Sequence, residues 1–201
     1  MKRLRRAFAC VMLLTAGAIA APAQLALPKD SVYQLPVVLT DQHGRSWDWR
    51  SRRGQPQVVA MFYTSCQYIC PLIVDSGKAV EHALTPAERA RLGILLISMD
   101  PMRDTPGALM SVANKRKLAG ARWTLASPNM DKVRSVAGVL GVRYRPLADG
   151  EFNHTSALVL LDPDGRILAR TEKIGSVLEA DFIAAVHRAT MGKIPIVARG
   201  P

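Results

Sequence analysis

The chain has 201 residues, a length typical of a single domain. Its hydrophobic content of 49% and charged content of 21% exclude a disordered chain, and its three cysteines are too few for a disulfide scaffold. The formal net charge of +11 raises the question of nucleic-acid binding, so the position of the basic residues along the chain matters.

The N-terminus has the pattern of a secretory signal peptide. Basic residues within 1–6 precede an uncharged apolar run over 7–20, and Ala21-Pro22-Ala23 offers small residues for cleavage. We expect residues 1–23 to be removed and the mature protein to be exported to the periplasm. Cleavage would remove four of the basic residues and lower the formal net charge from +11 to +7. The alternative is an uncleaved segment that anchors the protein to the membrane, although the apolar run is shorter than the roughly 20 residues of a typical span.

The remaining basic residues are scattered. Two short clusters, at 50–53 and 115–117, lack the interleaved aromatic residues of a nucleic-acid site. The sequence therefore favours a solvated basic face and no nucleic-acid partner. Proximity to anionic lipid head groups or to an acidic partner fits the charge of an exported protein.

Residues 24–36 are weakly patterned and are interpreted as a linker, residues 37–190 as one domain, and residues 191–201 as a loose tail. The domain opens with a predicted hairpin, 37–40 and 45–49, around a glycine-bearing turn. Apolar runs and periodicity then predict, in chain order, a strand over 57–63, helices over 71–84 and 85–91, a strand over 93–99, a helix over 105–118, a strand over 123–126, a helix over 129–140, strands over 157–161 and 166–170, and a helix over 177–190. Runs that are apolar on both faces require a sheet covered on both sides. The predicted fold class is α/β, a three-layer sandwich with a mixed central sheet.

Cys66 and Cys70 lie where a predicted buried strand passes into a helix. Backbone N–H groups at a helix start favour anions, so a thiolate there has a lowered pKa. Residues four apart share one helical face, so both sulfurs can point to the same spot, and Pro71 suits the first helical turn. In an oxidising compartment, this pair is a static disulfide, a redox couple or a metal site.

Two thiolates are soft ligands that select copper(I), zinc or iron–sulfur clusters. A structural zinc site needs four protein ligands, and no further cysteine remains after export. Two thiolates and one imidazole form a trigonal set that suits copper. Of the four histidines, we favour His154, because it comes just before the predicted strand over 157–161, whose end could lie beside the cysteines.

Three stretches resemble the Sco (SenC) family of thioredoxin-like copper-binding proteins. They are Tyr63-Thr64-Ser65-Cys66 to Cys70-Pro71, the most specific stretch Ser98-Met99-Asp100-Pro101-Met102-Arg103-Asp104-Thr105-Pro106, and His154-Thr155-Ser156, which is followed by a strand and Asp162-Pro163-Asp164-Gly165. The similarity covers about residues 37–190.

The resemblance implies a thioredoxin-like fold and a copper ion, Cu(I) or Cu(II), held by Cys66, Cys70 and His154. It implies a metallochaperone that helps to build the copper centre of cytochrome c oxidase, with an oxidase subunit as client and a copper donor or thiol reductant as a further partner. Asp100, Arg103 and Asp104 would then shape a loop near the site. From the residues alone, these three could instead cap the helix that begins at Thr105.

The sequence departs from the family pattern at several positions. Gln67 follows Cys66 where members commonly have proline, Tyr68-Ile69 replaces an acidic-apolar pair, and Phe62 replaces a glycine. Asn153 replaces the aspartate before the histidine, which removes a charged group that could orient the imidazole.

An alternative function is a thiol–disulfide oxidoreductase that acts on the cysteines of a client copper protein. Cys66 would attack and Cys70 would resolve the mixed disulfide, and both would then be catalytic. Two features argue against a general reductase. The spacing is C-x-x-x-C and not C-x-x-C. Thioredoxin-like reductases also resemble one another in a cis-proline before the strand that faces the cysteines, and no proline occurs here between Pro146 and Pro163. A peroxidase-type relative would need a base and an arginine after the cysteine, an arrangement that we do not identify. Enzymatic activity is thus left open, with the metallochaperone favoured.

Overall fold

The computed structural model describes residues 26–66, 68–118, 120 and 122–191. The expected signal peptide, 1–23, and the expected tail after Met191 lie outside the described residues. Among the described residues, none of the helices combines the length and the apolar character that crossing a bilayer requires.

The core of the fold is a mixed sheet of seven strands in the order β2-β1-β5-β4-β3-β8-β9. The three central strands β3, β4 and β5 are parallel, and the strands on both flanks run antiparallel to their neighbours. The strands of this sheet are β1 (Val38–Asp41), β2 (Ser46–Asp48), β3 (Gln57–Phe62), β4 (Gly93–Ser98), β5 (Trp123–Pro128), β8 (Leu158–Leu161) and β9 (Ile167–Thr171). The predicted mixed sheet and the N-terminal hairpin are confirmed.

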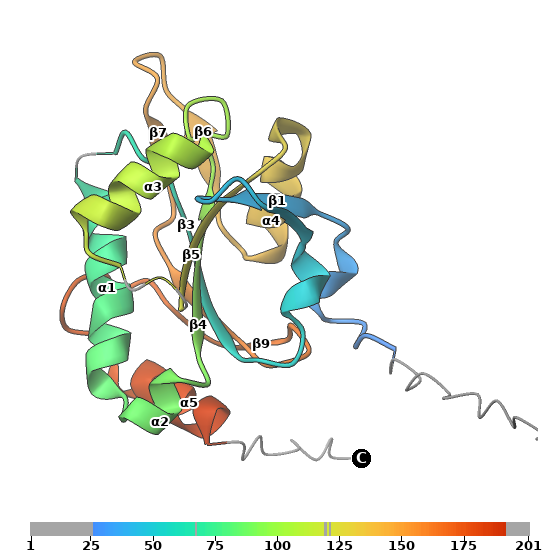
Figure 1. Ribbon diagram of the computed structural model, residues 1–201, viewed down its shortest axis with the longest axis vertical. Coiled ribbons are helices and arrows are strands. Elements are labelled where there is room, and N and C mark those ends of the chain that lie inside the picture. The colour runs from blue at the N-terminus through green and yellow to red at the C-terminus, as the bar shows by residue number, and fades with distance from the viewer. Residues whose placement is uncertain (1–25, 67, 119, 121, 192–201) are drawn as a thin grey trace, which may run out of the picture.

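Helices cover both faces of this sheet. In Figure 1, α1, α3 and α5 lie on one side and α4 lies on the other, which gives the three predicted layers. The coverage explains the sequence of β3, in which every residue is buried. The α-helices are α1 (Ile69–Ala83), α2 (Pro86–Arg89), α3 (Pro106–Lys115), α4 (Val133–Val139) and α5 (Ala180–Thr190), and the short 3-10 helices are η1 (Val32–Gln34), η2 (Trp49–Arg52) and η3 (Met130–Lys132).

The segment interpreted as a linker, 24–36, packs against the domain where it is described. Tyr33 in η1 is fully buried, and its ring meets the edge of Trp49 with centroids 6.0 Å apart. The Val32 N–H donates to the Gly165 carbonyl at 2.9 Å. These contacts come from residues distant in sequence, so the local pattern of the segment gives no sign of them.

A second, two-stranded sheet was not predicted. It consists of β6 (Tyr144–Pro146) and β7 (Phe152–His154), paired antiparallel so that Tyr144 lies opposite His154. His154 therefore ends a separate hairpin instead of simply preceding β8. Figure 1 shows this hairpin beyond the end of the sheet at which β3 passes into α1.

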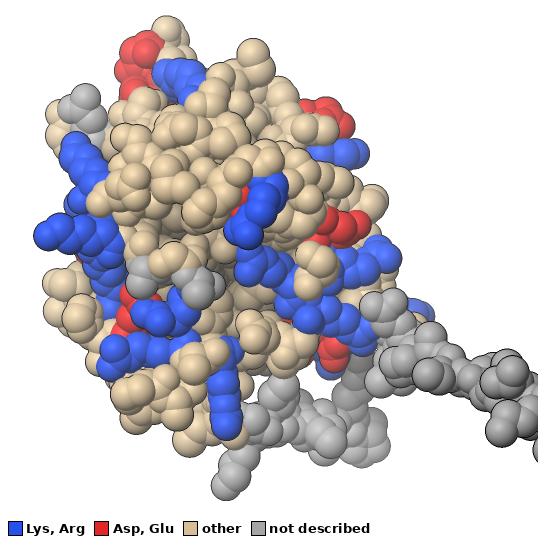
Figure 2. All heavy atoms as spheres, viewed as in Figure 1, with Lys and Arg blue, Asp and Glu red and all other residues tan. Residues whose placement is uncertain are grey.

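Basic side chains are spread over several areas of the surface. Figure 2 shows lysines and arginines in separate groups on one face, with acidic side chains among them. Several arginines form ion pairs, including Arg53 with Asp164 at 2.7 Å and Arg122 with Glu81 at 2.8 Å. Part of the basic surface is thus paired with acidic side chains.

Gly77 provides a test of the packing between α1 and the sheet. A methyl group at this position would lie 2.3 Å from Cη2 of Trp123, a buried ring whose Nε1–H donates to Glu81 at 2.8 Å. We expect Gly77→Ala to lower the free energy of unfolding by about 1–3 kcal/mol through overpacking. Gly138→Ala in α4, where nothing lies within 4 Å, is the matched control and should leave stability unchanged or raise it by up to about 1 kcal/mol. Equal stability of the two variants in chemical denaturation would contradict this packing.

Candidate metal and thiol site

Both cysteines lie at the junction of β3 and α1. They are free thiols, with Cys66 half-buried in the loop and Cys70 5% exposed in the first turn of the helix. Helix α1 begins at Ile69, two residues before the predicted start, and its N-cap residue Tyr68 makes no side-chain capping bond. The Cys66 sulfur takes over this role, because the Cys70 N–H donates to Cys66 Sγ at 3.3 Å.

The two sulfurs have opposite protonation preferences. The Cys70 thiol donates to the Cys66 sulfur and, together with the backbone N–H groups of Cys70, Tyr68 and Ile69, lowers the pKa of Cys66 to about 4 against the opposing effect of burial. The same hydrogen bond to Cys66, followed by burial, raises the pKa of Cys70. At neutral pH the pair is therefore a half-exposed thiolate beside a buried thiol.

Asp104 holds the loop that carries Cys66. Its buried carboxylate accepts from the Thr64 N–H at 3.1 Å, from the Thr64 hydroxyl at 2.5 Å and from the Ser98 hydroxyl at 2.6 Å. Burial raises the pKa of Asp104 in spite of these donors. The N-cap of α3 is Thr105, whose side chain accepts from Ala108, so Asp104 shapes the loop instead of capping the helix.

Asp100 and Arg103 form an ion pair that contacts the hairpin of His154. The Asp100 carboxylate pairs with the Arg103 guanidinium, which also donates to the Gly150 carbonyl in the loop between β6 and β7. The most specific sequence stretch, 98–106, thus contacts both the cysteine loop and the hairpin that carries His154.

His154 has one ring nitrogen turned to the backbone. Its Nδ1 lies 3.3 Å from the Thr155 carbonyl, and because a carbonyl can only accept, this contact places the proton on Nδ1 and leaves the Nε2 lone pair for a ligand. The partner of the imidazole is thus the Thr155 carbonyl, and the residue before His154 is the neutral Asn153.

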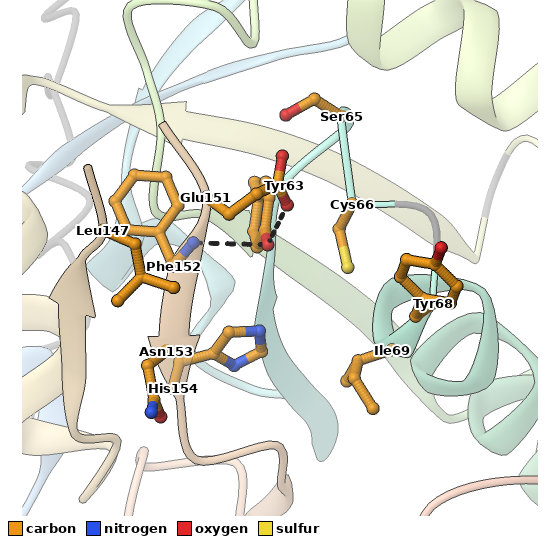
Figure 3. Close-up of a pocket in the computed structure, with 10 residues that line it drawn as sticks. All are labelled: Tyr63, Ser65, Cys66, Tyr68, Ile69, Leu147, Glu151, Phe152, Asn153 and His154. Carbon is orange, nitrogen blue, oxygen red and sulfur yellow. Dashed lines mark hydrogen bonds between the residues drawn. The ribbon is translucent and has the colours of Figure 1, made fainter. Parts of the chain in front are cut away.

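Cys66 and His154 line the same pocket, which has a volume of about 630 Å³. In Figure 3 the Cys66 sulfur and the His154 ring point into this pocket from opposite sides. Cys70 and Cys66 together line a smaller cavity of about 130 Å³. Within the described part of the chain, no group of three or more His, Cys, Asp or Glu side chains stands close enough to hold a metal ion. The hairpin and the cysteine loop would have to approach each other for all three predicted ligands to bind one ion.

The other histidines lie elsewhere. His43 and His82 are exposed, and His187 in α5 pairs with Glu88 in α2 at 2.7 Å. The structure therefore brings only His154, among the histidines, into the pocket of Cys66.

Two residues at the site, Tyr63 and Glu151, had no role assigned from the sequence. The Tyr63 hydroxyl donates to Glu151 at 2.7 Å, and the Tyr63 ring meets the rings of Phe152 and His154 at centroid distances of 5.0 and 5.8 Å. The Tyr63 N–H lies 3.4 Å from Cys70 Sγ. Tyr63 thus connects the dithiol to the hairpin of His154, and its place at the start of the stretch that resembles the Sco family was the signal for it in the sequence.

Comparison with known proteins identifies the family. The SCO1/SenC family profile matches residues 27–190. The chain belongs to the SCO1/SenC family.

Individual relatives agree with this assignment. A protein of Stutzerimonas stutzeri that is named for copper binding is 26% identical over 148 residues, 71% of this chain and 70% of the relative. The SCO1 protein homolog of Bacillus subtilis is 23% identical over 158 residues, 77% of this chain and 81% of the relative. The structure of Bradyrhizobium japonicum ScoI with copper bound matches with a TM-score of 0.63 and 25% identity, over 77% of this chain and 98% of ScoI. The similarity confirms the thioredoxin-like fold.

The lowered pKa of Cys66 can be measured on the reduced, metal-free protein. We expect a thiolate absorbance near 240 nm that is present at neutral pH and is lost as the pH falls through about 4. Cys70→Ala removes the S–H donor, so the midpoint should move up towards the ordinary cysteine value of about 8.5. A midpoint near 8.5 in the wild-type protein would contradict the arrangement of donors around Cys66.

Proposed function

We propose that the protein is a copper metallochaperone, with the copper ion as cargo bound by Cys66, Cys70 and His154. Its client would be a copper protein of the cytochrome c oxidase type, such as an oxidase subunit, loaded outside the cytoplasm. The observation that carries the proposal is the Cys66 thiolate facing the His154 imidazole across one pocket, with Cys70 in contact with Cys66.

The donor set fits copper. Two sulfurs and one imidazole are the trigonal set that suits copper, and thiolates favour Cu(I) among its oxidation states. Cys66 is already a thiolate at neutral pH, so only Cys70 would release a proton when the ion binds. Names of relatives support the same ion, since the Stutzerimonas stutzeri protein is named for copper and ScoI was solved with copper bound.

The surroundings of the pocket support transfer to a partner. Tyr68 is 83% exposed and lines the pocket with Ile69, and the exposed Leu147 lines it from the opposite, hairpin side. Exposed apolar side chains around a site are typical of protein contacts. A client that covered this rim could bring its own thiolate or imidazole to an ion held by three ligands, so that ligands exchange without other chemistry.

The protonation of the two sulfurs also favours a second candidate, a thiol–disulfide oxidoreductase. The Cys66 thiolate would attack a client disulfide, and Cys70 would then attack the mixed disulfide, which leaves an oxidised Cys66–Cys70 pair and a reduced client. The buried position of Cys70 suits the resolving step. The same sulfurs could serve both functions.

For the cellular location, we propose export to the periplasm with cleavage after Ala23. The proposal rests on the sequence pattern of residues 1–23. The mass of the protein recovered from the periplasmic and membrane fractions tests it, because a membrane-bound protein that keeps residues 1–23 would indicate the anchored alternative.

Titration of the reduced protein with Cu(I) in competition with a chromophoric chelator tests the ligand assignment. We expect one ion per chain in the wild type and an affinity at least about tenfold lower in His154→Ala, since a ligand is lost. His82→Ala, which changes an exposed histidine on α1, is the matched control and should bind as the wild type does.

Unchanged affinity in His154→Ala would contradict the assignment of this residue. Rapid reduction of generic disulfides by the copper-free protein, together with weak Cu(I) binding, would favour the oxidoreductase.

A further inference from the structure

The hairpin formed by β6 and β7 is held to the body of the protein close to His154. On one side, the Tyr63 hydroxyl donates to Glu151 Oε2 at 2.7 Å, and the Phe152 N–H lies 3.4 Å from the same hydroxyl oxygen. On the other side, Arg103 donates to the Gly150 carbonyl. Glu151 is thus the one acidic side chain among these contacts, and it directly precedes the strand that ends at His154.

Tyr63 belongs to the cysteine side of the pocket. It follows β3 directly, its carbonyl accepts from the Cys66 N–H at 3.4 Å, and its own N–H lies 3.4 Å from Cys70 Sγ. The Glu151–Tyr63 hydrogen bond therefore joins the two halves of the site, because one partner moves with the sulfurs and the other moves with the imidazole.

We propose that Glu151 is a positioning residue for the metal site, whose hydrogen bond with Tyr63 holds the His154 strand in reach of Cys66 and Cys70. The inference rests on the proposed function. In the described structure Cys70 contacts Cys66, while the His154 ring faces the Cys66 sulfur from across the pocket, so the hairpin would have to move towards the sulfurs for all three to bind one ion. A tethered hairpin has less conformational freedom to lose in this step, which increases affinity without any contact between Glu151 and the ion.

The contact depends on two residues that are not among the predicted ligands. A phenol and a carboxylate must both be present, at positions 63 and 151. Glu151 is partly buried at the edge of the pocket, where its hydrogen bond is less exposed to competition from water than one on the open surface.

The experiment compares Cu(I) affinity in two backgrounds. We expect Glu151→Ala to lower the affinity of the reduced protein about tenfold, in the range of residues that orient a metal ligand. Glu151→Gln keeps an acceptor for the Tyr63 hydroxyl and should restore most of the affinity. Tyr63→Phe keeps the ring contacts and removes the hydroxyl, which also contacts the Cys66 side chain, so it should lower the affinity at least as much as Glu151→Ala does. Asp149→Asn removes a charge of the same sign from the same loop and keeps the oxygen that accepts from the Glu151 N–H at 3.0 Å, so as matched control it should bind as the wild type does.

The second background is His154→Ala. If Glu151 acts through His154, adding Glu151→Ala to this variant should change the affinity by less than about twofold, although it costs about tenfold in the wild type. Hydrogen exchange of the copper-free protein gives a readout independent of the metal. Glu151→Ala should speed exchange of the amides of residues 152–154 and leave those of β4 unchanged.

Two results would overturn this inference and leave the proposed function standing. One is wild-type affinity in Glu151→Ala, and the other is an equal loss in both backgrounds, which would indicate a general effect on the fold. If His154→Ala itself binds Cu(I) as the wild type does, the ligand assignment fails first and the positioning role fails with it.

Discussion

The sulfur of Cys66 occupies the place of a capping group at the N-terminus of α1. Three backbone N–H groups and the Cys70 thiol converge on it, so a negative charge there satisfies donors that the helix would otherwise leave unpaired. The helix start, the thiolate and the proximity of the second sulfur are consequences of this one arrangement. The sequence alone predicts a helix from Pro71 onwards. The cap formed by the Cys66 sulfur explains why α1 begins earlier, at Ile69.

The sheet fixes where this sulfur can go. Strand β3 is buried along its whole length between parallel β4 and antiparallel β8, so its end is a rigid platform. Asp104 ties the following loop to that platform through Thr64, and Tyr63 extends from it to the hairpin of His154. The imidazole comes from a small, separate sheet, which Tyr63 and Arg103 hold to the body of the protein. A dithiol on the main sheet opposite an imidazole on a separate hairpin suits the proposed binding and release of an ion.

The sequence predicted those parts of the fold that depend on local pattern. Apolar runs identified β3 and β4, the capping residue Thr105 identified α3, and spacing brought Cys66 and Cys70 together. The hairpin of β6 and β7 was missed because its strands have three residues each, include Pro146 and are partly exposed, so no alternation marks them. Burial of Tyr33 and the bond between Tyr63 and Glu151 depend on residues far apart in sequence, which a single chain without its fold does not reveal.

The central claim is that two sulfurs and one imidazole bind a single copper ion. X-ray absorption spectroscopy of the reduced protein loaded with one equivalent of Cu(I) tests it most directly. The account predicts a three-coordinate ion with two sulfur neighbours and one imidazole nitrogen, and loss of the imidazole scattering in His154→Ala. A sulfur-only first shell in the wild-type protein, identical to that of the variant, would contradict it.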